Sequence, residues 1–573
     1  MNLFQWFVFF IGLQLIHFLA TYKLYVKAGY KAWQAVVPVY NAVILMKIIR
    51  RSPYWVILLF VPIINLIMFP VVWVELLRNF GRTKPYESYV TVFSLGFYLF
   101  LVGHDNQSNY QTEDDLKKQK KTSEWVSSIL FAVVAATLVH TYFMQPYAIP
   151  TGSLERTLRI GDFLLVSKFH YGARVPMTTV AAPMVHDTLP LVRTRSYLKK
   201  PQLPYLRLPG FQSVKKNDIV VFSWPADTVR QFFVAEKGVK KPIDKKSNYV
   251  KRCVGTPGDT LEIIDGFVHI NGKQLQLSDR AKPMYDHTVY ARKGVSSRWL
   301  EAIEAEGYTR TFRAEQLNQT QYNAMTPYLR DMSQNENYIE LVTASQGIPS
   351  AVLRQHRISL KEITTQEREV NLTDQMYQKL IGQEGVDSVI KKLQPKGVLG
   401  YNIFPQTPDQ YQWNNDQLGP LFIPKRGSSI ALNEKTYPLY KKIIREYEHN
   451  TLSKEGNSFL LNGEKATSYT FKMDYYWMMG DNRHHSEDSR TWGFVPEDHI
   501  VGKPVFIWMS WDNFNQGLFS WKGRWDRFFT TVNGKGEPVS YFWAFIFALG
   551  LYYLYSKFIH RKFFEYLKSK TNK

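Results

Sequence analysis

The sequence predicts a membrane-anchored protein with a mainly antiparallel β region, an α/β insertion within that region, and flanking transmembrane helices. Three observations predict this fold class. Uncharged runs of about 20 residues, long enough to cross a bilayer, occur near both ends of the chain. Short stretches rich in β-branched and aromatic residues lie between them. Residues 285–430 instead combine helical patterns with many polar residues.

These patterns divide the chain into eight segments. They are an N-terminal multi-span membrane module (1–104), a cytoplasmic linker (105–123), a transmembrane helix (124–144), the first part of a β core (145–284), the insertion or second lobe (285–430), the second part of the core (431–537), a C-terminal transmembrane helix (538–556) and a basic cytoplasmic tail (557–573).

The N-terminal module contains three uncharged runs, 1–22, 52–74 and 88–104. The first run has neither a basic start nor a small-residue cleavage site, so we interpret it as retained rather than removed. A shorter run, 32–46, is compatible with an interfacial, a re-entrant or a spanning segment. The module is therefore expected to be an anchor of three or four membrane segments.

Basic flanks predict how the two later spans are oriented. Residues 125–154 carry no charged side chain and follow a lysine-rich stretch at 117–121, whereas 538–556 are uncharged and precede a basic tail. Basic flanks stay in the cytoplasm. Both flanks thus place residues 145–537 on the outer face.

The charge balance favours a membrane surface over nucleic acid as a partner. The net charge is +22, which suits either anionic partner. The apolar runs favour the membrane, and the chain carries no nucleic-acid-binding motif. Cys253 is the single cysteine, which excludes an intrachain disulfide and a cysteine-based zinc site.

Within the outer region, several stretches are typical of strands. They are "DIVVFSW" (218–224), "NYVKRCVG" (248–255), "TLEIIDGFVHINGKQL" (260–275) and "KPVFIWMSW" (503–511). Asp265-Gly266 and Asn462-Gly463 each separate two such runs and predict two-residue hairpin turns. The run "DQMYQKLIGQEGVDSVIKKLQ" (374–394) predicts helix in the insertion.

A candidate nucleophile, Ser153, lies in "IPTGSLERTLRIGD" directly after an apolar run. A serine needs a base to become a useful nucleophile. Histidine is the first base to consider, but none lies in a motif typical of a catalytic triad, and a solvated or structural role is the better interpretation of each. The histidines of the outer region are His170, His186, His269, His287, His356, His449, His484, His485 and His499.

Lysine offers a second route, because burial lowers its pKa from about 10.4 toward neutral pH. Lys251 fits this route, since it lies between apolar residues in "NYVKRCVGTPGD". Alternation along a strand should turn Lys251 and Arg252 to opposite faces. On spacing alone, two surface charges on an edge strand are the favoured interpretation.

Four motifs reverse that preference. "IPTGSLERTLRIGDFLLVSK", "KKNDIVVFSWPAD", "NYVKRCVGTPGDTLEI" and "MMGDNRHHSEDSRTWGFVPEDHIVGK" occur in this order. Together they closely resemble the conserved sequence boxes of bacterial type I signal peptidase, a membrane-bound Ser-Lys protease with a β fold. The resemblance covers about 125–275 and 475–510, and the last motif is the most specific.

The resemblance implies a role for each matching residue. Ser153 corresponds to the nucleophile, Lys251 to the general base, and Ser486 to the residue that orients the lysine amine. Thr151 corresponds to the hydroxyl that, with the backbone N–H of Ser153, holds the oxyanion. The mechanism requires no metal and no cofactor.

Further matches imply supporting roles. Asp488 and Arg490 correspond to a charged pair behind the catalytic residues, and 480–482 to the turn that presents Ser486. Residues that correspond to the walls of the pockets for the −1 and −3 residues of the substrate are Tyr147, Ile149, Leu158, Tyr249 and Val250. Small apolar pockets select alanine or glycine by excluding larger side chains.

The sequence departs from the family pattern at a few positions. Leu154 and Arg156 replace the usual methionine and proline after the nucleophile, and neither change removes a catalytic atom. His484 and His485 replace the commoner Asp-Asn. Adjacent histidines can bind a metal, but in a loop they more often face solvent.

The resemblance implies a bacterial cytoplasmic (inner) membrane protein with its catalytic region on the periplasmic face. Its partners would be exported preproteins bearing signal peptides, membrane lipid and the protein-export machinery. Two alternatives remain: another Ser-Lys protease, such as a self-cleaving repressor, and a non-catalytic membrane scaffold. A repressor needs a DNA-binding motif and no spans, and a scaffold would lack Ser153 or Lys251, so the sequence favours neither.

Overall fold

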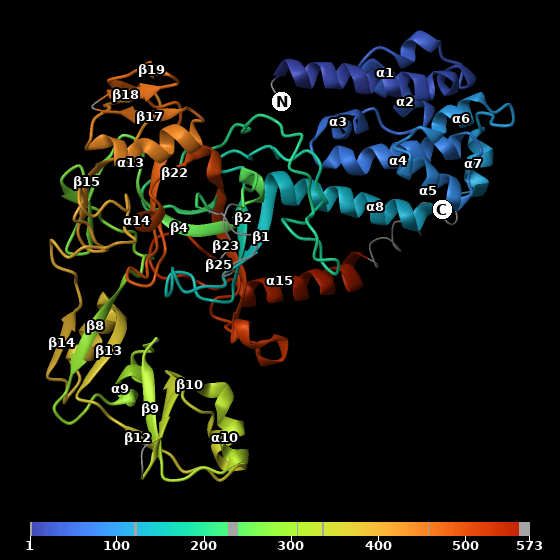
Figure 1. The fold of residues 1–573 in the computed structure, drawn as a ribbon. Helices are drawn as coiled ribbons and strands as arrows, with labels where there is room; N and C mark the ends of the chain where they lie inside the picture. Colours follow the sequence, from blue (N-terminus) through green and yellow to red (C-terminus); the bar gives the residue numbers. More distant parts are fainter. Residues whose placement is uncertain are drawn as a thin grey trace.

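The computed structural model describes residues 3–119, 123–226, 239–305, 307–334, 337–456 and 458–560. A helical module lies at one end of the molecule, a large sheet in the middle and a mixed α/β lobe at the other end (Figure 1). The basic tail predicted for 557–573 lies outside the described residues from 561 onward, as do 120–122 next to the first predicted span.

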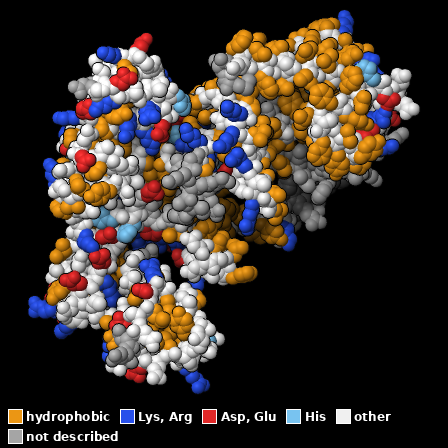
Figure 2. All heavy atoms as spheres, in the orientation of Figure 1, with side chains coloured by type: hydrophobic (Ala, Val, Ile, Leu, Met, Phe, Trp, Pro, Cys, Tyr) orange, Lys and Arg blue, Asp and Glu red, His pale blue; other side chains and the backbone are white. Residues whose placement is uncertain are grey.

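The N-terminal module is a bundle of helices around one apolar core. Its helices are α1 (Leu3–Lys27), α2 (Tyr40–Ile48), α3 (Trp55–Phe60), α4 (Ile64–Asn79), α5 (Pro85–Phe93) and α6 (Tyr98–His104), followed by α7 (Glu113–Gln119) in the linker. Exposed apolar side chains gather over this module (Figure 2).

Two of the uncharged runs are interrupted rather than continuous. Helix α3 ends before Pro62, whose ring and missing N–H oppose helix continuation, and α4 follows it. Gly96, at φ 87°, lies between α5 and α6. Of the described residues, one helix, Phe4–Lys27, is long and apolar enough to cross a membrane, and Phe131–Phe143 is a shorter apolar helix.

The two helices that flank residues 145–537 overlap the uncharged runs expected there. Helix α8 (Ser123–Leu138) continues through a wider turn at Val139–Phe143 and leads directly into the first strand. Val134 and Leu138 pack against the core of the N-terminal module. Near the other end, α15 (Phe542–Leu554) has mostly exposed apolar side chains.

The central sheet is antiparallel, as the sequence predicts. Its strands, in spatial order, are β1 (Met144–Ala148), β2 (Asp162–Ser167), β23 (Ile500–Asp512), β3 (Ile219–Ser223), β4 (Asn248–Gly255), β21 (Tyr475–Met479) and β22 (Val495–Pro496), with β24 (Lys522–Gly523) and β25 (Thr530–Thr531) beside β23. Strand β1 lies at an edge and pairs with β2 from Met144↔Ser167 to Ala148↔Phe163.

A second β unit packs beside this sheet around the largest apolar core. It contains β5 (Thr260–Ile264), β6 (Phe267–Ile270), β7 (Lys273–Gln274), β15 (Leu418–Phe422), β16 (Ser429–Ala431), β17 (Leu452–Glu455), β18 (Ser458–Leu461), β19 (Glu464–Lys465), β20 (Ser468–Thr470) and helix α13 (Thr436–Lys442). Strand β15 pairs with β5, so this part of the 285–430 segment belongs to the core.

Both predicted hairpin turns are present. Asp265 and Gly266 join β5 to β6 with φ angles of 49° and 78°, and Asn462 and Gly463 join β18 to β19 with 54° and 91°. Positive φ at both central residues is the geometry that matches the twist of a two-residue hairpin.

The remaining lobe combines strands and helices, in agreement with the α/β insertion expected from the sequence. One sheet has the order β13 (Glu367–Thr373), β8 (Met284–Tyr290), β14 (Ser388–Lys391), and another has β10 (Leu329–Gln334), β11 (Ile339–Ala344), β9 (Thr309–Ala314), β12 (Lys361–Ile363). The helices are α9 (Ser297–Ala302), α10 (Gln319–Met325), α11 (Ser350–Gln355) and α12 (Asp374–Ile381). The helix expected over 374–394 ends at Ile381, because 388–391 pair with β8.

Candidate active site

Strand β4 turns Lys251 and Arg252 to opposite faces, as alternation predicts. Both side chains are buried, and each has its own partner. Lys251 Nζ donates to Ser486 Oγ at 3.1 Å, whereas Arg252 forms a two-bond ion pair with Asp481 at 2.6 and 2.8 Å. The interpretation of these residues as surface charges on an edge strand is therefore wrong.

Gly480 brings Ser153 and Ser486 together. It follows β21, and a Cβ atom at this position would lie 2.2 Å from Ser486 Oγ and 2.5 Å from the carbonyl oxygen of Ser153. Only a residue without a side chain permits that approach. The segment of Ser153 therefore lies against Ser486, which also accepts the bond from Lys251.

Asn482 forms two hydrogen bonds with the backbone of the segment that contains Ser153. Its backbone N–H donates to the carbonyl of Ser153 and its side-chain amide donates to the carbonyl of Gly152, both at 3.1 Å. The turn 480–482, expected from the sequence to present Ser486, thus also fixes the backbone around Ser153. Thr151 is exposed at the start of this segment.

The charged pair Asp488 and Arg490 lies directly behind Gly480. Arg490 donates to both carboxylate oxygens of Asp488, at 2.9 and 2.8 Å, and both residues are buried. Asp488 accepts a further bond from the N–H of Gly480 at 3.0 Å and caps the short helix α14 (Ser489–Trp492). A buried, fully bonded ion pair of this kind fixes local geometry.

Thr157 is a site residue that the sequence analysis missed. Its hydroxyl donates to Asp481 at 2.6 Å, so Asp481 ties the segment after Ser153 to Arg252 on β4. A threonine four residues after a candidate nucleophile carries no distinguishing pattern, and only the fold reveals its partner.

Burial dominates the electrostatics of Lys251, which is 2% exposed. Loss of hydration lowers the pKa of Lys251 to about 8; the nearby Asp488 carboxylate raises it, and Arg490 lowers it. Burial alone would raise the pKa of Asp488, but the positive charges of Arg490 and Lys251 keep it below its ordinary value. The site thus holds an amine that is readily neutral beside a charged carboxylate.

Four of the five expected pocket residues meet in one apolar cluster. Ile149 and Leu158 are buried in it, and Tyr147 and Val250 pack against it. Tyr249 points to the other face of β4, where its ring stacks on Trp224 at 5.0 Å and lies under Lys251 Nζ at 5.6 Å. Tyr249 therefore lies on the face of Lys251 rather than in the cluster.

The two adjacent histidines bond to carboxylates of other segments. Nε2 of His485 lies 2.9 Å from Asp286, and Nε2 of His484 lies 3.1 Å from Asp416. The backbone N–H of Asp286 donates to Nδ1 of His484 at 3.0 Å. These contacts join the start of the inserted lobe to the turn that carries Ser486. Among the described residues, the hydrogen bonds of His484 and His485 go to carboxylates and not to Ser153.

Comparison with known proteins identifies two sequence families in the chain. A model of signal peptidases, peptidase S26, matches residues 122–347 and 423–511, which is more than half of the chain. A model of a family of unknown function, DUF5684, matches residues 33–113 in the N-terminal module.

Curated proteins similar to this chain are signal peptidases I. That of Buchnera aphidicola subsp. Acyrthosiphon pisum (strain APS) is 24% identical over 434 residues, or 75% of this chain and 89% of that protein. That of Haemophilus influenzae (strain ATCC 51907 / DSM 11121 / KW20 / Rd) is 24% identical over 423 residues, or 72% and 76%. That of Rickettsia massiliae (strain Mtu5) is 26% identical over 171 residues, or 30% and 51%.

Proposed function

Because this chain belongs to the signal peptidase S26 family, we propose that it removes signal peptides from exported preproteins as a membrane-bound serine endopeptidase. In this proposal Ser153 is the nucleophile and Lys251 is the general base. The observation that carries it is the buried Lys251 amine, which donates to Ser486 at 3.1 Å beside the segment of Ser153.

The proposed mechanism assigns a group to each chemical step. Neutral Lys251 accepts the proton of Ser153 Oγ as that oxygen attacks the carbonyl carbon of the scissile bond. The backbone N–H of Ser153 and the hydroxyl of Thr151 stabilise the oxyanion. Protonated Lys251 then returns the proton to the leaving amine, and a water activated by the same amine hydrolyses the acyl-enzyme.

Ser486 has a positioning role in this mechanism. A lysine side chain has four methylene groups and many rotamers, so an amine without a fixed partner is poorly aimed. The bond from Nζ to Ser486 Oγ fixes the amine, while Gly480 holds Ser486 against the segment of Ser153. The ion pair of Asp488 and Arg490 supports Gly480 from behind.

The edge of the sheet supplies a binding mode for the substrate. Strand β1 pairs with β2 on one side, so an extended peptide can add to its other side as a further strand. The apolar cluster of Tyr147, Ile149, Leu158 and Val250 would then receive small side chains at −1 and −3. Tyr249, on the opposite face of β4, would contribute beside Lys251 instead.

The proposed setting is the outer face of a bacterial cytoplasmic membrane, reached by several passes of the chain. The long apolar helix Phe4–Lys27, the shorter apolar helix Phe131–Phe143 and the exposed apolar surface of α15 support this placement. A membrane-bound enzyme and a membrane-bound preprotein share one plane, which raises their effective concentration. Lipid and the export machinery are the remaining proposed partners.

Cleavage of a purified preprotein tests the proposed function directly. The full chain in detergent should cut a preprotein with Ala-x-Ala before the mature sequence, and N-terminal sequencing of the product should give cleavage after the second alanine. Replacing the −1 alanine of the substrate with phenylalanine should block cleavage, because the added ring meets the packed walls of the cluster. Equal cleavage of the phenylalanine substrate would contradict the pocket assignment.

The pH dependence of cleavage should follow a lysine. Because the base acts in its neutral form and its pKa is about 8, kcat/KM should rise about tenfold per pH unit below pH 8 and level off above it. Steady-state kinetics from pH 5.5 to 10 would measure this profile. A rise that is complete by pH 7 would instead indicate a histidine base.

A further inference from the structure

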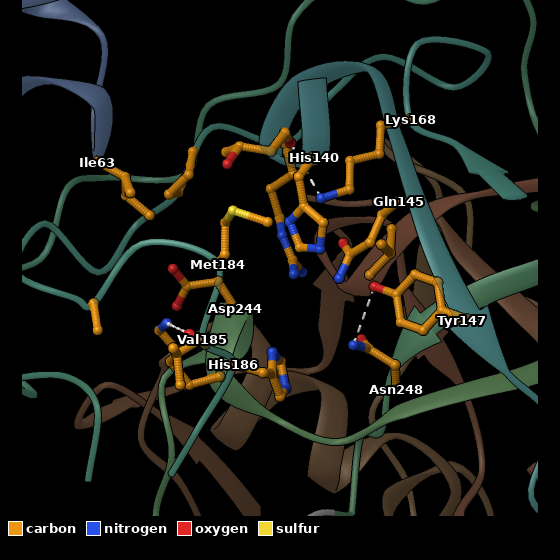
Figure 3. Close-up of a pocket in the computed structure, with 16 residues that line it drawn as sticks. Ile63, His140, Gln145, Tyr147, Lys168, Met184, Val185, His186, Asp244 and Asn248 are labelled. Carbon is orange, nitrogen blue, oxygen red and sulfur yellow. Dashed lines mark hydrogen bonds between the residues drawn. The ribbon is translucent and has the colours of Figure 1, made fainter. Parts of the chain in front are cut away.

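A polar cavity of about 170 Å³ lies where α8 leads into β1. It is far larger than the ~15 Å³ that a single water needs. Ile63 of the N-terminal module lies at one side of it, and Tyr147 and Asn248 of the central sheet lie at the other (Figure 3). The loop after β2, including Met184 and His186, and the turn at Asp244 and Lys245 contribute further parts of the wall.

The side chains around this cavity carry an excess of positive charge. Lys168, Arg174 and Lys245 line it together with His140 and His186, whereas Asp244 is the single carboxylate among the lining residues. Asp244 already accepts two bonds from Thr178, at 2.9 and 2.7 Å.

The cations are bonded to neutral groups. Lys168 Nζ donates to the carbonyl of Thr141 at 3.1 Å, and Lys245 Nζ donates to the carbonyl of Val185 at 3.4 Å. Arg174 donates to the carbonyl of Asp498 and to Ser223 Oγ. In the described part of the chain, neither lysine forms a salt bridge. Of the carboxylates behind the cavity, Asp187 forms an ion pair with Lys241, whereas Asp498 bonds to His499 and its charge also acts on Arg174.

Asp244 lies close enough to offset part of the charge of Arg174 and Lys245. Lys245 is only 5% exposed. Burial, reinforced by the charge of Arg174, lowers the pKa of Lys168 to about 7. Buried charges in proteins are normally paired. A cavity lined by three basic side chains and one carboxylate carries more positive than negative charge and therefore fits an anionic ligand.

We infer that this cavity binds the phosphate of an anionic glycerophospholipid. Lys168, Arg174 and Lys245 supply charge-assisted donors to the phosphate oxygens. The choice of lipid over a soluble phosphate rests on the apolar part of the wall, since Ile63, Met184 and Val185 offer a path for acyl chains beside the cationic groups. It also rests on the proposed membrane placement, which brings the end of α8 to the headgroup layer.

The N-terminal module forms part of the proposed lipid site. Ile63 comes from that module, and Tyr142 Oη, just before β1, donates to the carbonyl of Pro62 at 3.3 Å. A lipid bound here would contact the module and the catalytic sheet at once. Tyr147, which also packs against the proposed substrate cluster, lines the same cavity.

Lipid binding to the full chain in detergent tests this inference. Native mass spectrometry would compare dioleoyl-phosphatidylglycerol with dioleoyl-phosphatidylcholine and inorganic phosphate as probes. Wild type should prefer phosphatidylglycerol at least about tenfold, and the variant Lys168→Gln/Lys245→Gln should lose that preference, since each lost charge-assisted bond is worth about a tenfold change. The matched control, Lys199→Gln/Lys200→Gln, removes two exposed charges from the same loop and should retain it.

Three results would overturn the inference: equal binding of the two lipids, full preference in the Lys168/Lys245 variant, or displacement of phosphatidylglycerol by millimolar inorganic phosphate. If the double variant does not fold, Lys168→Gln alone, at a partly exposed site, should still weaken binding about tenfold. Preprotein cleavage by wild type in detergent is measured separately. A wild type that cleaves the preprotein but shows no preference for phosphatidylglycerol rejects the lipid site alone, whereas a wild type that never cleaves rejects the proposed function.

Discussion

Replacing Lys251 with methionine is expected to lower kcat/KM for preprotein cleavage by at least about 10³-fold. The amine is the proposed base, and methionine keeps the unbranched, buried stem but accepts no proton. Because Lys251 is 2% exposed, an apolar side chain of similar length should leave the fold intact. Single-turnover cleavage of an Ala-x-Ala preprotein, with a thermal unfolding midpoint for each variant, would measure both effects.

His485→Ala is the matched control for this experiment. His485 lies one residue from Ser486 but bonds to Asp286, so its loss should change kcat/KM by less than about tenfold. Ser486→Ala should fall between the two, because it leaves the base present but without its fixed partner. A Lys251→Met enzyme that still cuts, or a His485→Ala enzyme that does not, would contradict the assignment of the base.

Local features of the fold could be predicted from the sequence because they depend on neighbouring residues. The stretch 248–255 forms β4 with the expected bounds, and Asp-Gly and Asn-Gly give the expected hairpins. Alternation along β4 separates Lys251 from Arg252. Each of these outcomes follows from the geometry of a few consecutive residues.

Features that depend on distant partners could not be predicted in this way. Strand β15 pairs with β5 across a whole lobe, and nothing in its sequence specifies that partner. The helix expected over 374–394 ends early because 388–391 pair with β8. Counting charges also identified 52–74 as one run, although Pro62 breaks its helix.

In the candidate site, too, local features could be predicted from the sequence and contacts between distant segments could not. Periodicity alone favoured a surface role for Lys251, and only the resemblance to a family linked it to Ser153 and Ser486. The structure explains why composition was insufficient: Asp481 and Asn482 bond to Thr157 and Gly152, which lie 324 and 330 residues earlier in the sequence. The sequence does not distinguish a buried lysine from an exposed one, because burial depends on which residues pack around the side chain.

Gly480→Ala is expected to lower kcat about 10²-fold while changing KM little, since a misplacement of about 1 Å in a catalytic group costs about that much. The added Cβ would lie 2.2 Å from Ser486 Oγ and 2.5 Å from the backbone carbonyl of Ser153, so the groups on both sides must move. The apolar cluster of Ile149 and Leu158 does not include Gly480 or Ser486. Substrate binding should therefore be largely unaffected. Steady-state kinetics would separate kcat from KM.

Gly382→Ala is the matched control for the close approach at Gly480. Its added Cβ would lie 3.7 Å from the nearest atom, an ordinary contact, and its φ of −84° suits alanine. The two variants thus make the same chemical change, and they differ in whether Ser153 and Ser486 must separate. A Gly480→Ala enzyme with wild-type kcat would show that Ser486 does not need to lie against the segment of Ser153. That result would also contradict the proposed role of Ser486 in positioning the Lys251 amine.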